Sequence, residues 1–103
     1  MPDGLFSSTF TETTAVLTVS GDLIDDVSVG ALRTALAQHS GDSSRDMVVD
    51  LSTVTFLSSP AVGALATARE ERLGAGVSFE MVAPDGSVAQ RVLKVCALPY
   101  RTD

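Results

Sequence analysis

The chain has 103 residues, with 13 acidic and 7 basic side chains and a formal net charge of -6. This acidic balance repels phosphate backbones and anionic lipid surfaces, so we expect neither nucleic acid nor membrane as a partner. The length fits one domain, taken as residues 1–103. Hydrophobic residues make up 45% and charged residues 19%, which is typical of a globular protein and excludes a disordered one.

Targeting features are also missing from the sequence. Residues 1–4 contain no basic segment followed by an apolar one, and no apolar run approaches the ~20 residues needed to span a bilayer. We therefore expect a cytoplasmic protein. Cys96 is the only cysteine, which excludes an internal disulfide, and its apolar helical surroundings predict a packed thiol.

The first half of the chain predicts a β-hairpin followed by a helix. Residues 6–11 alternate weakly and residues 13–19 are rich in β-branched side chains, as in two paired strands. Residues 20–22 break that pattern. After Asp25 and Asp26, apolar residues recur at helical spacing to about residue 40, so we expect a first helix with an aspartate as its cap.

The central part predicts a strand and a second helix. Residues 47–51 are almost continuously apolar, which favours a strand buried on both faces. The second helix is expected to start at Pro60, with Ser59 as its cap. Gly63 inside this helix disfavours the helical state, so a close contact with the sheet is expected to favour it.

The remaining pattern completes an α/β order. Residues 77–82 alternate as a strand, and residues 88–95 show a third helical pattern. Strands that alternate with helices imply crossovers that place helices over parallel strands. We therefore predict one α/β domain with a mixed, largely parallel central sheet of about four to five strands and helices packed on it.

The sequence offers little support for metal binding, catalysis or nucleotide binding. Asp22, Asp25 and Asp26 lack the ligand spacing of a calcium loop and have no histidine near them, so turn and capping roles are expected and no metal. The serines lack a recognisable activating base, and no phosphate-binding glycine loop is present. We expect no catalytic residue, no cofactor and no enzymatic activity.

One stretch resembles a known family. Residues 48–63 read VVDLSTVTFLSSPAVG, which is similar without gaps to the signature of bacterial anti-sigma-factor antagonists, or STAS domains, usually DLS-x-V-x-F-[ILM]-D-[ST]-[ST]-G-L-G. GDL at residues 21–23 and ALR at residues 31–33 resemble the family's G-E-L-D segment and first helix. Residues 89–95 resemble its late helix. The resemblance thus covers most of the chain and implies the STAS fold.

The resemblance also implies a regulatory role. An anti-sigma factor antagonist binds an anti-sigma factor that is also a serine kinase of the histidine-kinase ATPase type, and thereby frees a sigma factor for transcription. By position, the phosphorylated residue is Ser58, with Ser59 as the alternative. The expected partner-binding residues are Asp22, Thr55, Leu57, Ser58, Ser59, Ala61 and Val62, with residues 55–59 as a loop.

The sequence departs from the family pattern at four places. Leu57 and Ile24 stand where the family has aspartates, and Pro60 replaces a glycine. The chain ends soon after Tyr100, whereas relatives commonly continue into a last strand and helix, so residues 99–102 are expected to form a shortened edge strand. The first three departures favour an alternative: a non-phosphorylated scaffold or adaptor that binds a partner constitutively or self-associates, for example as a homodimer.

Overall fold

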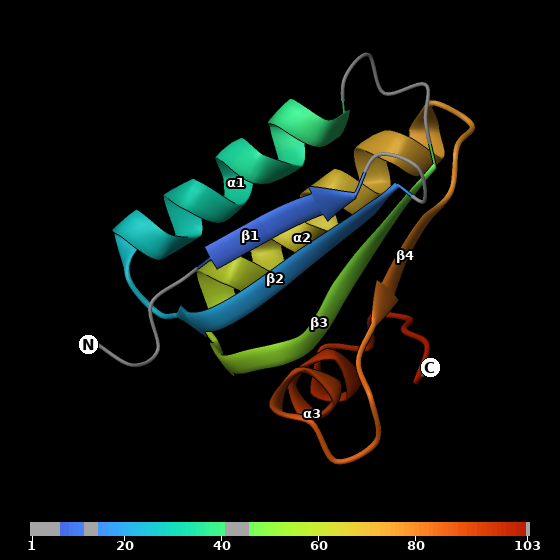
Figure 1. Cartoon of the computed structure of the whole chain (residues 1–103). Helices are drawn as coiled ribbons and strands as arrows, with labels where there is room; N and C mark the ends of the chain where they lie inside the picture. Colours follow the sequence, from blue (N-terminus) through green and yellow to red (C-terminus); the bar gives the residue numbers. More distant parts are fainter. Residues whose placement is uncertain (1–6, 12–14, 41–45, 103) are drawn as a thin grey trace.

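The computed structural model describes residues 7–11, 15–40 and 46–102 (Figure 1). Their strands and helices follow one another in the order that the sequence predicts. The connection at residues 12–14 and the polar turn at residues 41–45 lie outside the described residues. The strands are β1 (Ser7–Thr11), β2 (Val16–Leu23), β3 (Met47–Leu57) and β4 (Phe79–Val82); the helices are α1 (Asp26–Ser40), α2 (Ser59–Gly74) and α3 (Val88–Val95).

Within the described residues, the strands form a four-stranded sheet in the order β1-β2-β3-β4. β1 and β2 pair antiparallel, as the predicted hairpin requires, whereas β2 pairs with β3 and β3 with β4 in parallel. Next to β4, Arg101 forms one parallel bridge with Val82. The Arg101 amide donates to the Met81 carbonyl at 2.8 Å, so the expected edge strand is reduced to a single bridge. The predicted fold class is confirmed.

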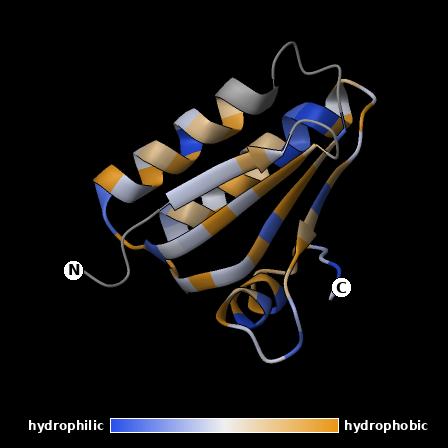
Figure 2. Ribbon diagram, in the orientation of Figure 1, coloured by the Kyte–Doolittle hydropathy of each residue, from blue (hydrophilic) through white to orange (hydrophobic). Residues whose placement is uncertain are grey.

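The core lies between the sheet and the helices. α1 and α2 run side by side over one face of the sheet, and α3 packs separately against β3 (Figure 1). Buried residues alternate along β2, and along β3 as far as Leu51, because every second side chain points towards this core (Figure 2). Beyond Leu51, the buried residues of β3 are Val54 and Leu57. Val48 and Asp50 on the other face of β3 are only half-buried, so the expected burial on both faces is wrong. The fully buried positions include Leu17, Val19, Leu23, Leu32, Val49, Leu51, Leu65 and Leu93.

Both central strands are longer than the sequence predicts. Gly21 has a φ of +93°, a conformation that glycine adopts without steric cost, and the pairing with β3 shifts between Gly21 and Asp22. This irregularity allows β2 to continue to Leu23 instead of breaking at residues 20–22. β3 likewise continues to Leu57, so residues 55–57 are strand and not the predicted loop.

The start of α2 also differs from the prediction by one residue. Ser58 is the N-cap: its backbone is extended, with φ of -76° and ψ of 164°, and its Oγ accepts a hydrogen bond from the Ala61 amide at 3.4 Å. Ser59, the predicted cap, is the first helical residue and is exposed. Pro60 lies in the first turn, where its missing amide hydrogen costs nothing.

Two further side-chain predictions are wrong. A Cβ built on Gly63 would meet no atom within 4 Å, so no close packing against the sheet explains this helical glycine. Cys96 is exposed and not packed, because α3 ends at Val95 and buries Ala89 and Leu93 in its place.

Replacing the cap serine should destabilise the fold, whereas replacing its neighbour should not. We expect Ser58→Ala to lower the free energy of unfolding by about 1 kcal/mol, because an α2 amide loses its acceptor. Ser59→Ala, the matched control, should change it by less than about 0.5 kcal/mol, because Ser59 is exposed. Urea denaturation measures both values; equal effects of the two substitutions would contradict this assignment of the cap.

Candidate partner-binding site

The predicted site residues meet where β2 and β3 end. The two strands are parallel, with Leu23 opposite Leu57, so their carboxyl ends lie together, and α1 and α2 start there. The Ser58 amide, directly after β3, donates a hydrogen bond to the carbonyl of Leu23, the last residue of β2, at 2.9 Å. We call this surface, formed by residues 22–28 and 55–62, the strand-end face.

Ser58 and Ser59 lie at the centre of the strand-end face. Ser58 is half-buried and its Oγ is turned towards the first amides of α2, whereas Ser59 is exposed. The unpaired amides and partial positive charge at the start of a 16-residue helix favour an anionic group next to them. A phosphate on Ser58 would therefore be compatible with the helix start.

Asp22 and Thr55 are brought together across the strand pair. The Thr55 hydroxyl donates a hydrogen bond to Oδ1 of Asp22, although 33 positions separate the two residues in the sequence. Thr55 is exposed and Asp22 is half-buried, so this polar pair is accessible from solvent. The sequence places both residues at the predicted face, but their direct contact follows only from the pairing of β2 with β3.

Asp25 caps α1, as predicted. Its Oδ1 accepts a hydrogen bond from the Ser28 amide at 2.8 Å, and the Asp25 amide donates to the Ser28 hydroxyl at 3.2 Å. These reciprocal bonds satisfy donors at the helix start. The bond from the Ser28 backbone amide, followed by that from its hydroxyl, holds the pKa of the Asp25 carboxyl below its ordinary value. Asp25 thus has a structural use at the face.

Three expected partner-binding residues point into the core. Leu57, Ala61 and Val62 are 5%, 0% and 7% exposed. Leu57 pairs with the buried Leu23 across the two strands, and Ala61 and Val62 lie on the buried side of α2. Such side chains offer little surface to another protein, so Asp22, Thr55, Ser58 and Ser59 are the expected residues that remain accessible.

Three exposed apolar residues at the face were not among the expected partner-binding residues, and one of them is Ile24, which directly follows β2 and is 54% exposed. Phe56 is 50% exposed because it precedes the inward-facing Leu57 in a strand, and Val27 in the first turn of α1 is 80% exposed. A strand predicted to continue to Leu57 would have placed Phe56 on the side opposite to Leu57. No local pattern distinguishes Val27 from the apolar residues that α1 buries.

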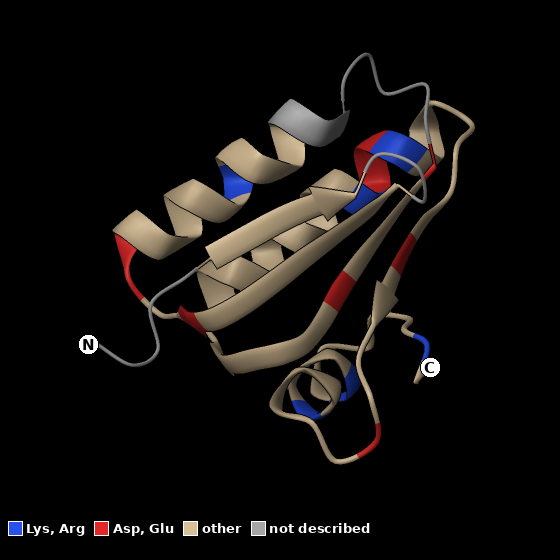
Figure 3. Cartoon of the chain, in the orientation of Figure 1, with Lys and Arg blue, Asp and Glu red and all other residues tan. Residues whose placement is uncertain are grey.

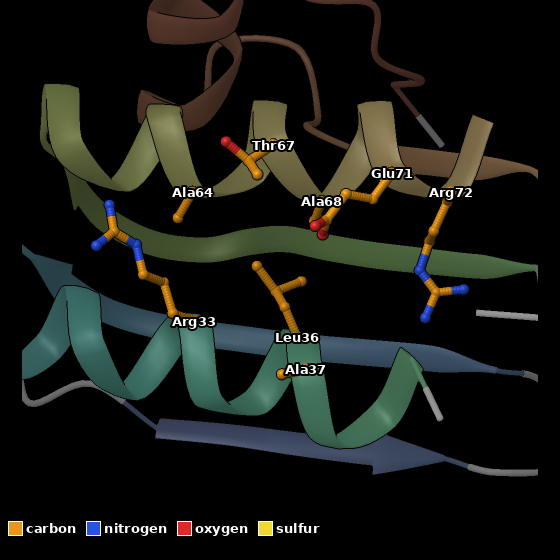
Figure 4. Close-up of a pocket in the computed structure, with 8 residues that line it drawn as sticks. All are labelled: Arg33, Leu36, Ala37, Ala64, Thr67, Ala68, Glu71 and Arg72. Carbon is orange, nitrogen blue, oxygen red and sulfur yellow. The ribbon is translucent and has the colours of Figure 1, made fainter. Parts of the chain in front are cut away.

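A cleft of about 320 Å³ lies elsewhere, between α1 and α2 (Figure 4). Arg33 and Arg72 lie near its two ends, and the Arg72 side chain is almost completely buried. None of the predicted site residues lines this cleft. Its lining residues are Arg33, Leu36, Ala37, Ala64, Thr67, Ala68, Glu71 and Arg72.

Metal and membrane features can be assessed for the part of the chain that the structure describes. In residues 7–11, 15–40 and 46–102, no three His, Cys, Asp or Glu side chains gather in a way that could hold a metal ion. In the same ranges, no helix is long and apolar enough to cross a membrane.

Comparison with known proteins identifies the family to which this fold and site belong. The STAS domain family matches residues 6–99, and the chain belongs to this family. The resemblance seen in the sequence is thereby confirmed. The anti-sigma-F factor antagonist RsfB of Mycobacterium tuberculosis, strain H37Rv, is 38% identical over 84 residues, which are 82% of this chain and 66% of RsfB. RsfB of strain CDC 1551 / Oshkosh gives the same values. The match thus spans slightly less than two thirds of these curated relatives.

Solved structures give the same class. The crystal structure of an anti-sigma factor antagonist from Mycobacterium paratuberculosis has a TM-score of 0.82 and 29% identity, over 97% of this chain and 88% of that one. The anti-sigma factor antagonist SpoIIAA in its unphosphorylated form has a TM-score of 0.69 and 16% identity, over 91% of this chain and 82% of SpoIIAA. The likeness to SpoIIAA concerns the fold alone.

Acid should weaken the fold partly through Asp25. Because its folded pKa is lowered from 3.8, its contribution to stability is complete above that value and is lost as the pH falls through the folded pKa. Asp25→Asn keeps a capping oxygen but does not titrate there. We expect urea midpoints between about pH 5 and about pH 2 to fall more steeply for the wild type than for Asp25→Asn. Identical slopes would contradict the role of the ionised cap.

Proposed function

We propose that this chain is an anti-sigma factor antagonist that binds an anti-sigma factor through its strand-end face and is released by phosphorylation of Ser58. The observation that carries the proposal is the position of Ser58. In a STAS domain whose curated relatives are named anti-sigma-F factor antagonists, it caps α2 beside an exposed Ser59 on a surface where two strands end and two helices begin.

The helix start supports a modification that leaves the fold intact. Phosphorylation would add a charge of about -1.5 to -2 next to the first amides of α2, where the helix dipole favours an anion. Ser58 Oγ already accepts a bond from the Ala61 amide at 3.4 Å, so a phosphate oxygen could take over that acceptor role. The modification would thus act mainly on the partner.

The charge of the face supports the direction of the switch. Asp22, Asp25 and Asp26 lie at the end of β2 and the start of α1 (Figure 3). A phosphate on Ser58 would join these carboxylates on one surface and would have to be desolvated when a partner docks. The unmodified face binds, whereas the phosphorylated face would bury a doubly charged anion against the partner at a high desolvation cost.

The proposal assigns a binding role and no catalytic one. Its partner is an anti-sigma factor of the serine-kinase type. The kinase binds ATP and catalyses the phosphate transfer, so this chain needs only an accessible hydroxyl. Ser58 Oγ bonds to a helix amide, an arrangement that caps a helix and does not activate a nucleophile. Because sigma factors act on RNA polymerase, the proposal places the chain in the cytoplasm.

A constitutive adaptor is the second candidate. It is favoured by Leu57, which packs in the core directly before Ser58, and by Pro60, which restricts the first turn of α2 directly after Ser59. A kinase must fit this restricted segment into its active site. The adaptor would bind its partner, or a second copy of itself, without phosphate transfer.

An aspartate at Ser58 should weaken partner binding without destabilising the chain. Aspartate is itself a good N-cap, so Ser58→Asp should retain the wild-type urea midpoint within error. We expect its Kd for the anti-sigma factor, measured by calorimetry, to rise at least about tenfold. Ser87→Asp is the matched control, because Ser87 caps α3 by accepting from the Gln90 amide at 3.1 Å, outside the strand-end face.

A phosphorylation assay with anti-sigma kinases distinguishes the phosphorylation switch from the constitutive adaptor. Each anti-sigma kinase of the host bacterium is incubated with the chain and ATP, and the modified residue is mapped by mass spectrometry. Phosphate on Ser58 together with weaker binding supports the switch. Binding without phosphate transfer supports the constitutive adaptor. An unchanged Kd of Ser58→Asp would show that Ser58 does not lie in the interface.

A further inference from the structure

Exposed apolar side chains concentrate at the strand-end face. Among the described residues, the large hydrophobic side chains with the greatest exposure are Ile24, Val27, Phe56, Leu73 and Val95. The first three, exposed by 54%, 80% and 50%, all belong to the strand-end face. Leu73 lies at the far end of α2, and Val95 ends α3. The exposed apolar surface is thus concentrated at the face where Ser58 lies.

Ile24 and Phe56 lie at the ends of the neighbouring strands β2 and β3. Phe56 is opposite Asp22 in the parallel pair, and both lie on the side away from the buried pair of Leu23 and Leu57. Ile24 follows Leu23 directly, beside the bond between the Ser58 amide and the Leu23 carbonyl.

Acidic residues flank these apolar residues. Asp22 precedes Ile24 by two positions, and Asp25 and Asp26 lie between Ile24 and Val27. Residues 22–28 and 55–62 contain three aspartates and no Lys or Arg. The strand-end face therefore exposes three large apolar side chains among three carboxylates and carries no basic side chain. Exposed apolar side chains gathered on one surface are typical of a protein interaction site.

We propose that Ile24, Val27 and Phe56 are the apolar anchors of the partner interface, and that they dock on a protein surface whose apolar hollow is bordered by Lys and Arg. This inference rests on the proposed function and adds the chemistry of its partner. The anchors supply contact area, and Asp22 and Asp26 pair with the basic border. A phosphate on Ser58 acts next to the anchors and need not touch them.

The three aspartates of the face favour a partner protein with a basic border over a second copy of this chain or a lipid surface. A second copy would bring three aspartates against three aspartates in a symmetric contact, which repels. An anionic lipid surface is disfavoured for the same reason. A basic border on another protein turns the repulsion into attraction and accelerates association at low salt.

The test measures binding of apolar-to-polar variants to the anti-sigma factor that the wild type binds. Ile24→Ser, Val27→Ser and Phe56→Thr should each raise the Kd about tenfold, equivalent to about 1.4 kcal/mol. Leu73→Ser and Val95→Ser remove comparably exposed apolar side chains outside the face and should leave the Kd within about twofold. Thermal unfolding checks that every variant is folded.

Salt provides the second arm of the experiment. Raising NaCl from about 0.05 M to about 0.5 M should slow association with the partner several-fold, and Asp26→Asn should reduce this dependence. Wild-type Kd values for all three anchor variants would overturn the inference and leave the proposed function standing. Absence of wild-type binding to any anti-sigma factor would overturn both. Self-association of the wild type that is lost in the anchor variants would assign the face to a second copy and also overturn the inference.

Discussion

The parallel pairing of β2 with β3 is the interaction on which the rest of the structure depends. It places Leu23 beside Leu57 and lets the Ser58 amide bond to the Leu23 carbonyl at 2.9 Å. Because each strand is followed directly by a helix, this pairing also determines where α1 and α2 begin. Residues more than 30 positions apart in the sequence thereby form one surface, on which a cap serine, an acidic border and apolar side chains lie together.

As a helix cap, Ser58 would serve both the fold and the proposed switch. A hydroxyl and a phosphate are both acceptors, and both suit the positive start of a helix. Phosphorylation at this site would change the surface charge and not the packing, since the α2 side chains next to it, Ala61 and Val62, are already buried. A regulatory site at this position can therefore change affinity without unfolding the domain.

The order of the strands and helices could be predicted from the sequence because each has a local period and a local cap. The exact ends of β2 and β3 could not, because they depend on Gly21 with its φ of +93° and on a non-local bond at Ser58. The amide of Ser58 thereby bonds to β2 while its hydroxyl caps α2, one residue earlier than the sequence predicts. Because β3 extends to Leu57, the Leu57 side chain points inward and the Phe56 side chain points outward. The sequence pattern predicts a shorter strand, and therefore does not show which of these two residues is exposed at the face.

The account is tested most directly by mapping the bound surface on the ¹⁵N-labelled chain by NMR during titration with its anti-sigma factor. It predicts that amide shifts change mainly in residues 22–28 and 55–62, and that phosphorylation of Ser58 abolishes these changes. Shift changes confined to the α1–α2 cleft, for example at Thr67 and Glu71, would contradict it. So would binding that leaves the amides on both sides of Ser58 unchanged.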